Sequence, residues 1–488
     1  MSVYFYISIS TYLLLKQRSY ELSESVSPPK ITNEHSNVER NINDSTTLSP
    51  RGTSTLQPIL SYFSLFIQCL QNPHSSDNPM GLISLCVAEN KLCHEMLEER
   101  FKKTKGFEGK ESFSYDDMSG LLSLKTSMAS LVTRKFIHDK YNVKPESLVI
   151  SSGAASILDH LSFLLASPGE GCMIPTPFYA AFVNDMSVRG QLNILPLNST
   201  LGQPTVSNLE VLWKDSMEKG VRPRILLLTN PHNPTGVISS VECLRGSVEW
   251  ARRKGMHVIV DEIYALSTFS GDKFTSIIEV LEGNLGNNVH VIWALSKDFG
   301  SSGLRVGCLI SHNSEVINGL NNVNVFSSVS NPMQLACAEV LGDEKWVDEY
   351  LEESNLRLRR AYEVVTGGLR GLGIPYTEAK AGMFVWLDLS SLLPEKSWEG
   401  EDALTSLIFE EGGIVLTPGQ SQKTSTPGFY RLCFAYNTME SLKVALARLE
   451  YVVGVVRERG WVDLDVEEMD EVNEGGVRRR GSSWVGED

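Results

Sequence analysis

The stretch "ALSKDFGSSGLRVG", residues 294–307, carries the two cations whose placement has the clearest chemical meaning. Lys297 stands at the end of an apolar run, and Arg305 follows it beyond a glycine-rich bend. Burial disfavours the charged form of an amine and lowers its pKa below the usual value of about 10.4. A neutral lysine attacks carbonyl groups and forms Schiff bases, and an arginine can clamp a phosphate. The alternative for Lys297 is a structural lysine whose ammonium reaches solvent.

Two further motifs place polar side chains directly after apolar runs. In "HVIVDEIYA", Asp261 ends such a run, and Tyr264 lies three residues on, close enough to share a ligand. A buried carboxylate is costly unless a cation meets it, although Asp261 could instead cap a helix. In "RILLLTNPHNPTG", Asn233 offers an amide for hydrogen bonding, but the same residues also describe a simple rigid turn.

A phosphate site and a ring-stacking residue complete the set. In "SSGAAS", the amides of Ala154 and Ala155 can face an anion at a helix N-terminus. Tyr179, in "PTPFYAAF", can stack on a flat ring or be an ordinary core tyrosine. Together, a carbonyl-seeking lysine, an acid for a ring cation, a stacking partner and a phosphate cup describe pyridoxal 5′-phosphate. This cofactor acts as an electron sink for a carbanion at Cα of an amino acid.

These residues must be positioned by the elements between which they stand. Short apolar runs alternate with longer stretches of helical spacing; the runs are "SLVI", "CMI", "NILPL", "RILLL", "HVIV", "HVIWAL" and "VGCLI". Such alternation predicts βαβ units and an α/β fold with a mainly parallel sheet covered on both faces. Ligands of these sheets bind beyond the carboxyl ends of the strands, where the motifs above are found.

Composition excludes several classes of protein. The chain has 488 residues, 42% of them hydrophobic, and a net charge of −15, which argues against sequence-independent nucleic-acid binding and against docking on anionic membranes. The eight cysteines have no CxxC spacing, which indicates free, mostly buried thiols in a reducing compartment and no metal site. The apolar stretch 3–15 is too short to span a membrane, so we expect a cytoplasmic protein, with a tethered N-terminus as the alternative.

The order of the motifs resembles the fold-type I pyridoxal-phosphate enzymes of the class I/II aminotransferase family, and most of all their 1-aminocyclopropane-1-carboxylate synthase-like branch. The resemblance covers roughly residues 75 to 455 and includes "VAENKL", "YDDMSG", "AGMFVWLDL" and "YRLCFA". It implies a large domain with a mixed, mainly parallel seven-stranded sheet flanked by helices, and a smaller α+β domain built from both chain ends. We expect the large domain at 113–334, the small domain at 59–112 and 335–458, and disordered segments at 1–58 and 459–488.

The resemblance also implies a role for each matching residue. Lys297 would form the Schiff base and move the proton at Cα, Asp261 would pair with the pyridine nitrogen, and Asn233 and Tyr264 would bond the ring oxygen. Tyr179 would stack on the ring. The phosphate would be held by Ala154, Ala155, Ser296 and Arg305, and by Tyr115 from a partner subunit in a homodimer. Arg431 would clamp the substrate carboxylate, with Glu89 near the substrate.

Two positions depart from the family pattern. Many relatives have a phosphate-binding serine at the position of Ala294, and the synthase branch has a tyrosine where this chain has Met118. The resemblance implies an enzyme acting on an α-amino acid, with transamination to a 2-oxo acid as the first expectation. Cyclisation to an aminocyclopropane acid and C–S lysis are the alternatives, and a catalytically silent pyridoxal-phosphate-binding regulator is the remaining one.

Overall fold

The computed structural model describes residues 48–56 and 60–461, and the chain divides into two compact units, 1–56 and 57–488. In the first unit the described residues form a short helix, α2 (Pro50–Ser54), which Ser49 caps by accepting a hydrogen bond from the amide of Gly52. The expectation of disorder for 1–58 and 459–488 lies mostly outside the described residues, and so does the apolar stretch 3–15.

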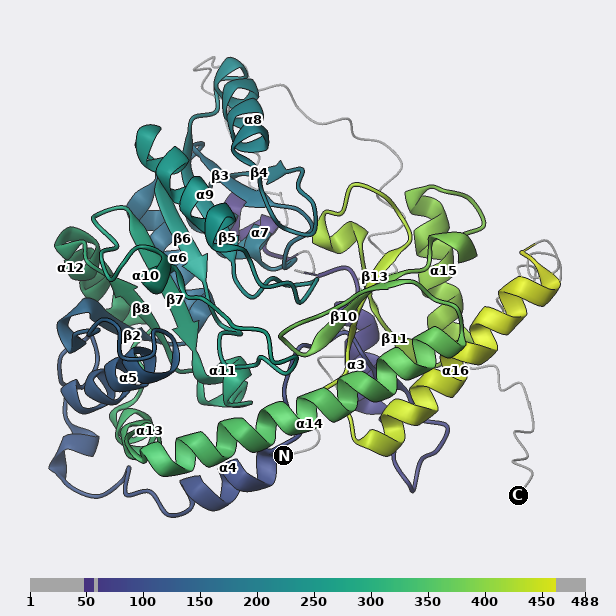
Figure 1. Cartoon of the computed structure of the whole chain (residues 1–488), viewed down its shortest axis with the longest axis horizontal. Coiled ribbons are helices and arrows are strands. Elements are labelled where there is room, and N and C mark those ends of the chain that lie inside the picture. Colours follow the sequence, from purple (N-terminus) through teal and green to yellow (C-terminus); the bar gives the residue numbers. More distant parts are fainter. Residues whose placement is uncertain (1–47, 57–59, 462–488) are drawn as a thin grey trace. The chain divides into compact units, whose positions relative to one another are not determined.

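The second unit contains a seven-stranded sheet in the order β2-β8-β7-β6-β5-β3-β4 (Figure 1). Its strands are β2 (Leu148–Ser151), β3 (Gly171–Pro175), β4 (Asn193–Leu197), β5 (Pro223–Thr229), β6 (His257–Asp261), β7 (Val289–Ala294) and β8 (Gly307–Ser311). Neighbouring strands are parallel except that β8 runs antiparallel to both β7 and β2. Each of the apolar runs named above forms one of these strands, so the predicted α/β fold with a mixed, mainly parallel sheet is confirmed.

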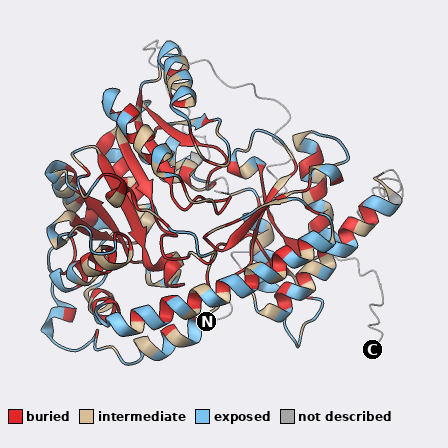
Figure 2. Ribbon diagram, viewed as in Figure 1, coloured by how far each residue is buried: buried red, intermediate tan, exposed pale blue. Residues whose placement is uncertain are grey.

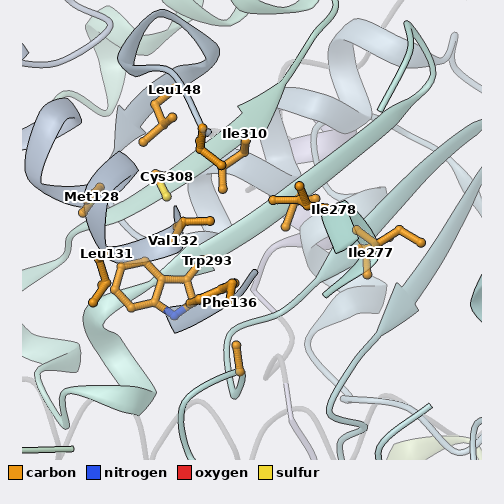
Figure 3. Close-up of a cluster of buried hydrophobic side chains, with 14 of the residues drawn as sticks. Met128, Leu131, Val132, Phe136, Leu148, Ile277, Ile278, Trp293, Cys308 and Ile310 are labelled. Atoms are coloured by element: carbon orange, nitrogen blue, oxygen red, sulfur yellow. The ribbon is translucent and has the colours of Figure 1, made fainter. Parts of the chain in front are cut away.

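Alternate residues of the strands bury their side chains on opposite faces of this sheet. Leu226 and Val258 belong to a cluster that also contains residues of α5, α9 and α10, whereas Ile225 and Ile259 belong to a cluster with residues of α6, α7 and α12. Figure 3 shows part of the first cluster, in which Trp293 of β7 lies against Phe136. In Figure 2 the strands of this sheet are largely buried, apart from the edge strand β4, while the covering helices expose their outer faces. Strands buried on both faces explain the continuous apolar runs in the sequence.

The helices around this sheet have the following bounds: α5 (Leu122–Lys135), α6 (Ala154–Leu165), α7 (Phe182–Ser187), α8 (Val206–Glu218), α9 (Val241–Arg253), α10 (Ile277–Val280), α11 (Leu295–Asp298), α12 (Ser314–Val323) and α13 (Asn331–Gly342). Short 3-10 turns are η1 (Lys110–Phe113), η2 (Pro145–Ser147), η3 (Ser302–Leu304), η4 (Asn324–Phe326), η5 (Ser390–Leu392) and η6 (Gln420–Gln422).

A second, antiparallel sheet has the order β12-β13-β10-β9, with β9 (Tyr376–Thr377), β10 (Phe384–Asp388), β12 (Thr417–Pro418) and β13 (Phe429–Cys433). It packs with α14 (Glu344–Gly371), α15 (Trp398–Glu410) and α16 (Met439–Arg459) around its own hydrophobic core. Long helix α14 contacts α13 near the large sheet and α16 beside the small one (Figure 1). The earlier part of the chain supplies α3 (Phe63–Gln71), α4 (His94–Phe101) and β1 (Ile83–Ser84), which pairs in parallel with β11 (Ile414–Val415). Pairing of β1 with β11 joins distant parts of the chain, but the domain boundaries themselves remain a prediction.

No helix in the described ranges, 48–56 and 60–461, is both long and apolar enough to cross a membrane. All the cysteines except the partly buried Cys243 are buried, which agrees with the expectation of mostly buried thiols.

Candidate functional site

A pocket of about 290 Å³ opens where the parallel strands β5, β6 and β7 end. It brings together residues that are far apart in the sequence but follow neighbouring strands. Of the residues predicted to bind the cofactor from within one chain, every one lines it: Ala154, Ala155, Tyr179, Asn233, Asp261, Tyr264, Ser296, Lys297 and Arg305. The tertiary structure therefore brings these residues together in one pocket, and their roles toward a cofactor stay a prediction.

Lys297 lies on α11, a single helical turn that begins immediately after β7. Its Nζ donates a hydrogen bond of 2.5 Å to the carbonyl oxygen of Ala88. Burial, followed by repulsion from the guanidinium of Arg431, lowers the pKa of Lys297 to about 8. About a tenth of this amine is therefore neutral, and nucleophilic, at pH 7.

The neighbouring Asp298 fixes α11 to the loop that follows β6. This fully buried carboxylate accepts hydrogen bonds from the backbone N–H of Leu266 at 3.1 Å, the hydroxyl of Ser267 at 2.6 Å and the indole N–H of Trp293 at 2.8 Å. Because this loop carries Tyr264 and starts directly after Asp261, Asp298 helps to set the position of Lys297 relative to both.

Asp261 is the last residue of β6 and is buried in the pocket. Its carboxylate accepts a hydrogen bond of 3.1 Å from the backbone N–H of Ile263, and no cation of the described residues forms an ion pair with it. Burial raises the pKa of Asp261 to about 7, an effect that this hydrogen bond and the charge of Lys297 oppose. A cationic ring nitrogen in the pocket would supply the missing partner.

Asn233 and Tyr264 lie side by side on the same wall of the pocket. The side-chain amide of Asn233 donates to the Tyr264 hydroxyl at 3.4 Å, and both residues are buried. Burial raises the pKa of Tyr264, which keeps its phenol protonated. The pair can therefore offer hydrogen-bond donors to one ligand oxygen.

The opposite end of the pocket has the chemistry of an anion site. Helix α6 begins at Ala154, and the preceding Gly153 has φ 84°, which leaves the first amides of the helix open to a ligand. A Cβ at Gly153 would lie 2.8 Å from a guanidinium nitrogen of Arg305, so only glycine lets this arginine approach the helix end. Arg305 itself has φ 57° and donates to the carbonyl oxygens of Ser302 and Ser152 at 3.0 and 3.3 Å.

The residues predicted to bind substrate lie beside the pocket. The guanidinium of Arg431 is buried and donates to the side-chain oxygen of Asn233 at 2.9 Å and to the carbonyl oxygen of Cys86 at 2.7 Å. The Glu89 carboxylate accepts a short hydrogen bond from the hydroxyl of Ser302, which lines the pocket. Both are thus joined by hydrogen bonds to pocket-lining residues.

Two residues singled out by sequence lie elsewhere. Tyr115 is 97% exposed and borders a separate surface depression with residues 325 and 328–332, so it does not join the pocket of its own chain. Ala294 is fully buried in the hydrophobic cluster that includes Tyr264 and is not among the residues that line the pocket.

The sequence motifs missed Asp185 and Tyr62. Asp185, on α7, lines the pocket, and burial together with repulsion from Asp261 raises its pKa to about 7. Tyr62 is buried near Arg431, whose charge opposes the rise that burial causes in the pKa of the Tyr62 hydroxyl. Nothing in the local sequence around Tyr62 indicates that contact.

The donors and acceptors of the pocket fit pyridoxal phosphate. An anion site at the start of α6, a buried acid without a cation and a lysine of lowered pKa correspond to its phosphate, ring nitrogen and aldehyde. The described residues contain no cluster of three or more His, Cys, Asp or Glu side chains able to hold a metal ion.

The model of the family described as "Aminotransferase class I and II" matches residues 81–449. The chain is 35% identical over 414 residues to 1-aminocyclopropane-1-carboxylate synthase 6 of Arabidopsis thaliana. This alignment covers 82% of this chain and 83% of that protein. It is 32% identical over 398 residues to 1-aminocyclopropane-1-carboxylate synthase of Nicotiana tabacum, covering 78% and 81%.

Among solved structures, an aspartate aminotransferase mutant of Thermus thermophilus superposes with a TM-score of 0.70 at 20% identity, covering 83% of this chain and all of the other. An aspartate aminotransferase of Thermotoga maritima superposes with a TM-score of 0.68 at 22% identity, with the same coverage. At these identities the two structures establish the fold alone.

Proposed function

Because the chain belongs to the class I and II aminotransferase family, whose members typically bind pyridoxal phosphate, we propose that it is a pyridoxal-phosphate-dependent enzyme that eliminates a leaving group from the side chain of an α-amino acid. The observation that carries the proposal is the pocket that gathers Lys297, Asp261 and the phosphate-binding elements. The choice of elimination rests on the relatives, which are aminocyclopropane-carboxylate synthases at 30–35% identity over about four fifths of the chain.

Residues of this chain would hold the cofactor at four points. Lys297 would hold its aldehyde carbon, Asp261 its protonated ring nitrogen, Tyr179 its flat face, and Arg305 with the amides at the start of α6 its phosphate. When bound, pyridoxal phosphate supplies a ring that accepts the electron pair left at the substrate Cα. Asp261, which forms no ion pair with a described residue, would keep the ring nitrogen protonated and the ring electron-poor.

The remaining residues would act on the substrate. Arg431 would bind the α-carboxylate through its planar pair of N–H donors. Lys297, once displaced by the substrate amine, would take the proton from Cα, for which a pKa near 8 is well matched. Asp261 and Tyr264, which line the pocket, are buried and therefore shielded from bulk water.

Product analysis with an amino-¹⁵N-labelled substrate panel tests the proposal. S-adenosylmethionine and S-substituted cysteines and homocysteines would be incubated with the cofactor-loaded protein and a 2-oxo acid acceptor. Elimination releases the label as ammonium or retains it in a cyclised product, whereas transamination moves it to the acceptor. The Lys297→Ala protein is the control, since it should give neither elimination products nor a labelled acceptor. Absence of any turnover in the wild-type protein would favour the silent, cofactor-binding regulator.

Transamination, the first expectation from sequence, stays as the second candidate. Met118 stands where the synthase branch has a tyrosine, so a residue of that branch is missing from this chain. Label found in the acceptor 2-oxo acid's product would select this candidate.

We also propose that the chain acts as a homodimer in which Tyr115 reaches the phosphate of the partner subunit. Phe113, Tyr115 and Val325 border one depression and are 77%, 97% and 53% exposed, an unusual display of apolar surface. Sedimentation of the wild-type protein should give twice the chain mass, and Phe113→Glu should shift it to the monomer. A monomeric wild-type protein with full activity would contradict this arrangement.

A further inference from the structure

Glu89, the acid predicted to lie near the substrate, forms an ion pair with a neighbouring lysine. Glu89 is 24% exposed and lies 3.7 Å from the ammonium of Lys91, which is 35% exposed. Lys91 is itself held in place, because its Nζ lies 3.5 Å from the ring centroid of Tyr436 and its backbone N–H donates to the carbonyl oxygen of Ala435. Ser302 donates a further hydrogen bond to Glu89. The carboxylate therefore has both a counter-charge and a donor within the chain.

Besides Glu89, the charges that act on Lys297 are the cation Arg431 and the acid Asp261, which a protonated ring nitrogen of the cofactor would neutralise. Arg431 and Lys297 are close enough for the guanidinium to depress the lysine's pKa, and Glu89 acts on the same lysine in the opposite direction. Under the proposed function, the substrate carboxylate neutralises Arg431, and Lys297 is either bonded to the cofactor or present as a neutral base. What remains near the substrate side chain is Glu89 with Lys91, a pair of zero net charge.

We propose that Lys91 is a specificity-determining residue that cancels the charge of Glu89, so that the site takes amino acids whose leaving group is a neutral sulfur substituent instead of a cationic sulfonium. The inference rests on the proposed function, because it assigns the substrate class of that same site. A lone carboxylate there would attract a sulfonium, whereas an acid already paired with an ammonium gives a cation no net gain.

A matched ligand pair isolates this effect. L-Methionine and S-methyl-L-methionine share the amino-acid group and differ by a methyl group and one positive charge. Their dissociation constants would be measured with the cofactor-loaded protein by the change in cofactor absorbance and, independently, by calorimetry. We expect the wild-type protein to bind the neutral ligand at least as tightly as the cation. In Lys91→Gln the ratio of the two constants should move toward the cation by about fivefold, the size expected of one partly exposed ion pair.

Two further variants complete the test. Lys102→Gln removes the same charge from an exposed pair with Glu98 on α4 and should leave the ratio unchanged. Adding Glu89→Gln to Lys91→Gln should abolish the gained preference. Tighter binding of the cation by the wild-type protein, or an unchanged ratio in Lys91→Gln, would overturn the inference while leaving the proposed function in place. If no amino acid changes the cofactor absorbance of any variant, the proposed function fails, and this inference fails with it.

Discussion

Asp298 offers the sharpest test of how the site is held together. Replacing it with alanine leaves the backbone N–H of Leu266 and the indole N–H of Trp293 buried without acceptors, since both bond the same carboxylate oxygen. Each unsatisfied buried donor costs about 1–3 kcal/mol, so Asp298→Ala should lower the free energy of unfolding by roughly 2–6 kcal/mol. The hydroxyl of Ser267 can rotate and find another arrangement, so its bond is left out of this range.

Asp298→Asn is the matched control. Its amide oxygen can keep the two N–H donors, and its NH₂ group can donate to the Ser267 hydroxyl, so we expect a loss of only about 1 kcal/mol. Urea unfolding followed by tryptophan fluorescence and by circular dichroism would give both values. Equal losses for Ala and Asn, or an Ala variant as stable as the wild type, would refute the assigned hydrogen bonds.

The same pair of proteins gives a pH dependence with a definite sign. Burial raises the pKa of Asp298 to about 7, whereas in the unfolded chain an aspartate titrates near 3.9. Between these values the folded protein holds one more proton than the unfolded chain, so this group makes stability fall as pH rises from about 4 to about 7. The Asn variant lacks this contribution, and the stability difference between it and the wild type should therefore change across that window. A constant difference would contradict the raised pKa.

The remaining predictions concern the pocket itself. Borohydride should fix a phosphopyridoxyl group on Lys297, and a label mapped to any other lysine would exclude its role. The rate at which the apoprotein captures the cofactor should rise as pH increases through about 8, because only the neutral amine of Lys297 attacks. Asp261→Asn should slow turnover about a hundredfold or more, from a loss of about 3 kcal/mol of transition-state stabilisation, and near-normal kcat would end this role. Arg431→Lys should raise KM far more than it lowers kcat, since a lysine cannot form the paired hydrogen bonds to a carboxylate, and an unchanged KM would point to another carboxylate site.

Local sequence was sufficient for the sheet and for the residues at its strand ends. Strands buried on both faces must be apolar throughout, so the runs that form β5, β6 and β7 are visible without any knowledge of their partners. Polar residues at the end of such a run, or a few positions beyond it, lie near the carboxyl edge of the sheet, which is why Asp261, Asn233 and Lys297 were predicted to share one site. The turn at Gly153 and the start of α6 could likewise be predicted from the short motif at residues 151–156.

Tertiary structure alone decided which distant groups surround those residues. Asp298 looks in the sequence like a surface acid beside a lysine, but its partners Leu266 and Ser267 come from the loop after β6, about thirty residues earlier. Likewise, Tyr62 lies more than three hundred residues before Arg431 and meets it only through packing. The pKa and the energy of a buried charged group depend on the groups that the fold places within a few ångströms of it. Spacing along the chain does not predict those distances. The sequence therefore determined the chemistry at the strand ends, and the fold determined the charges that tune it.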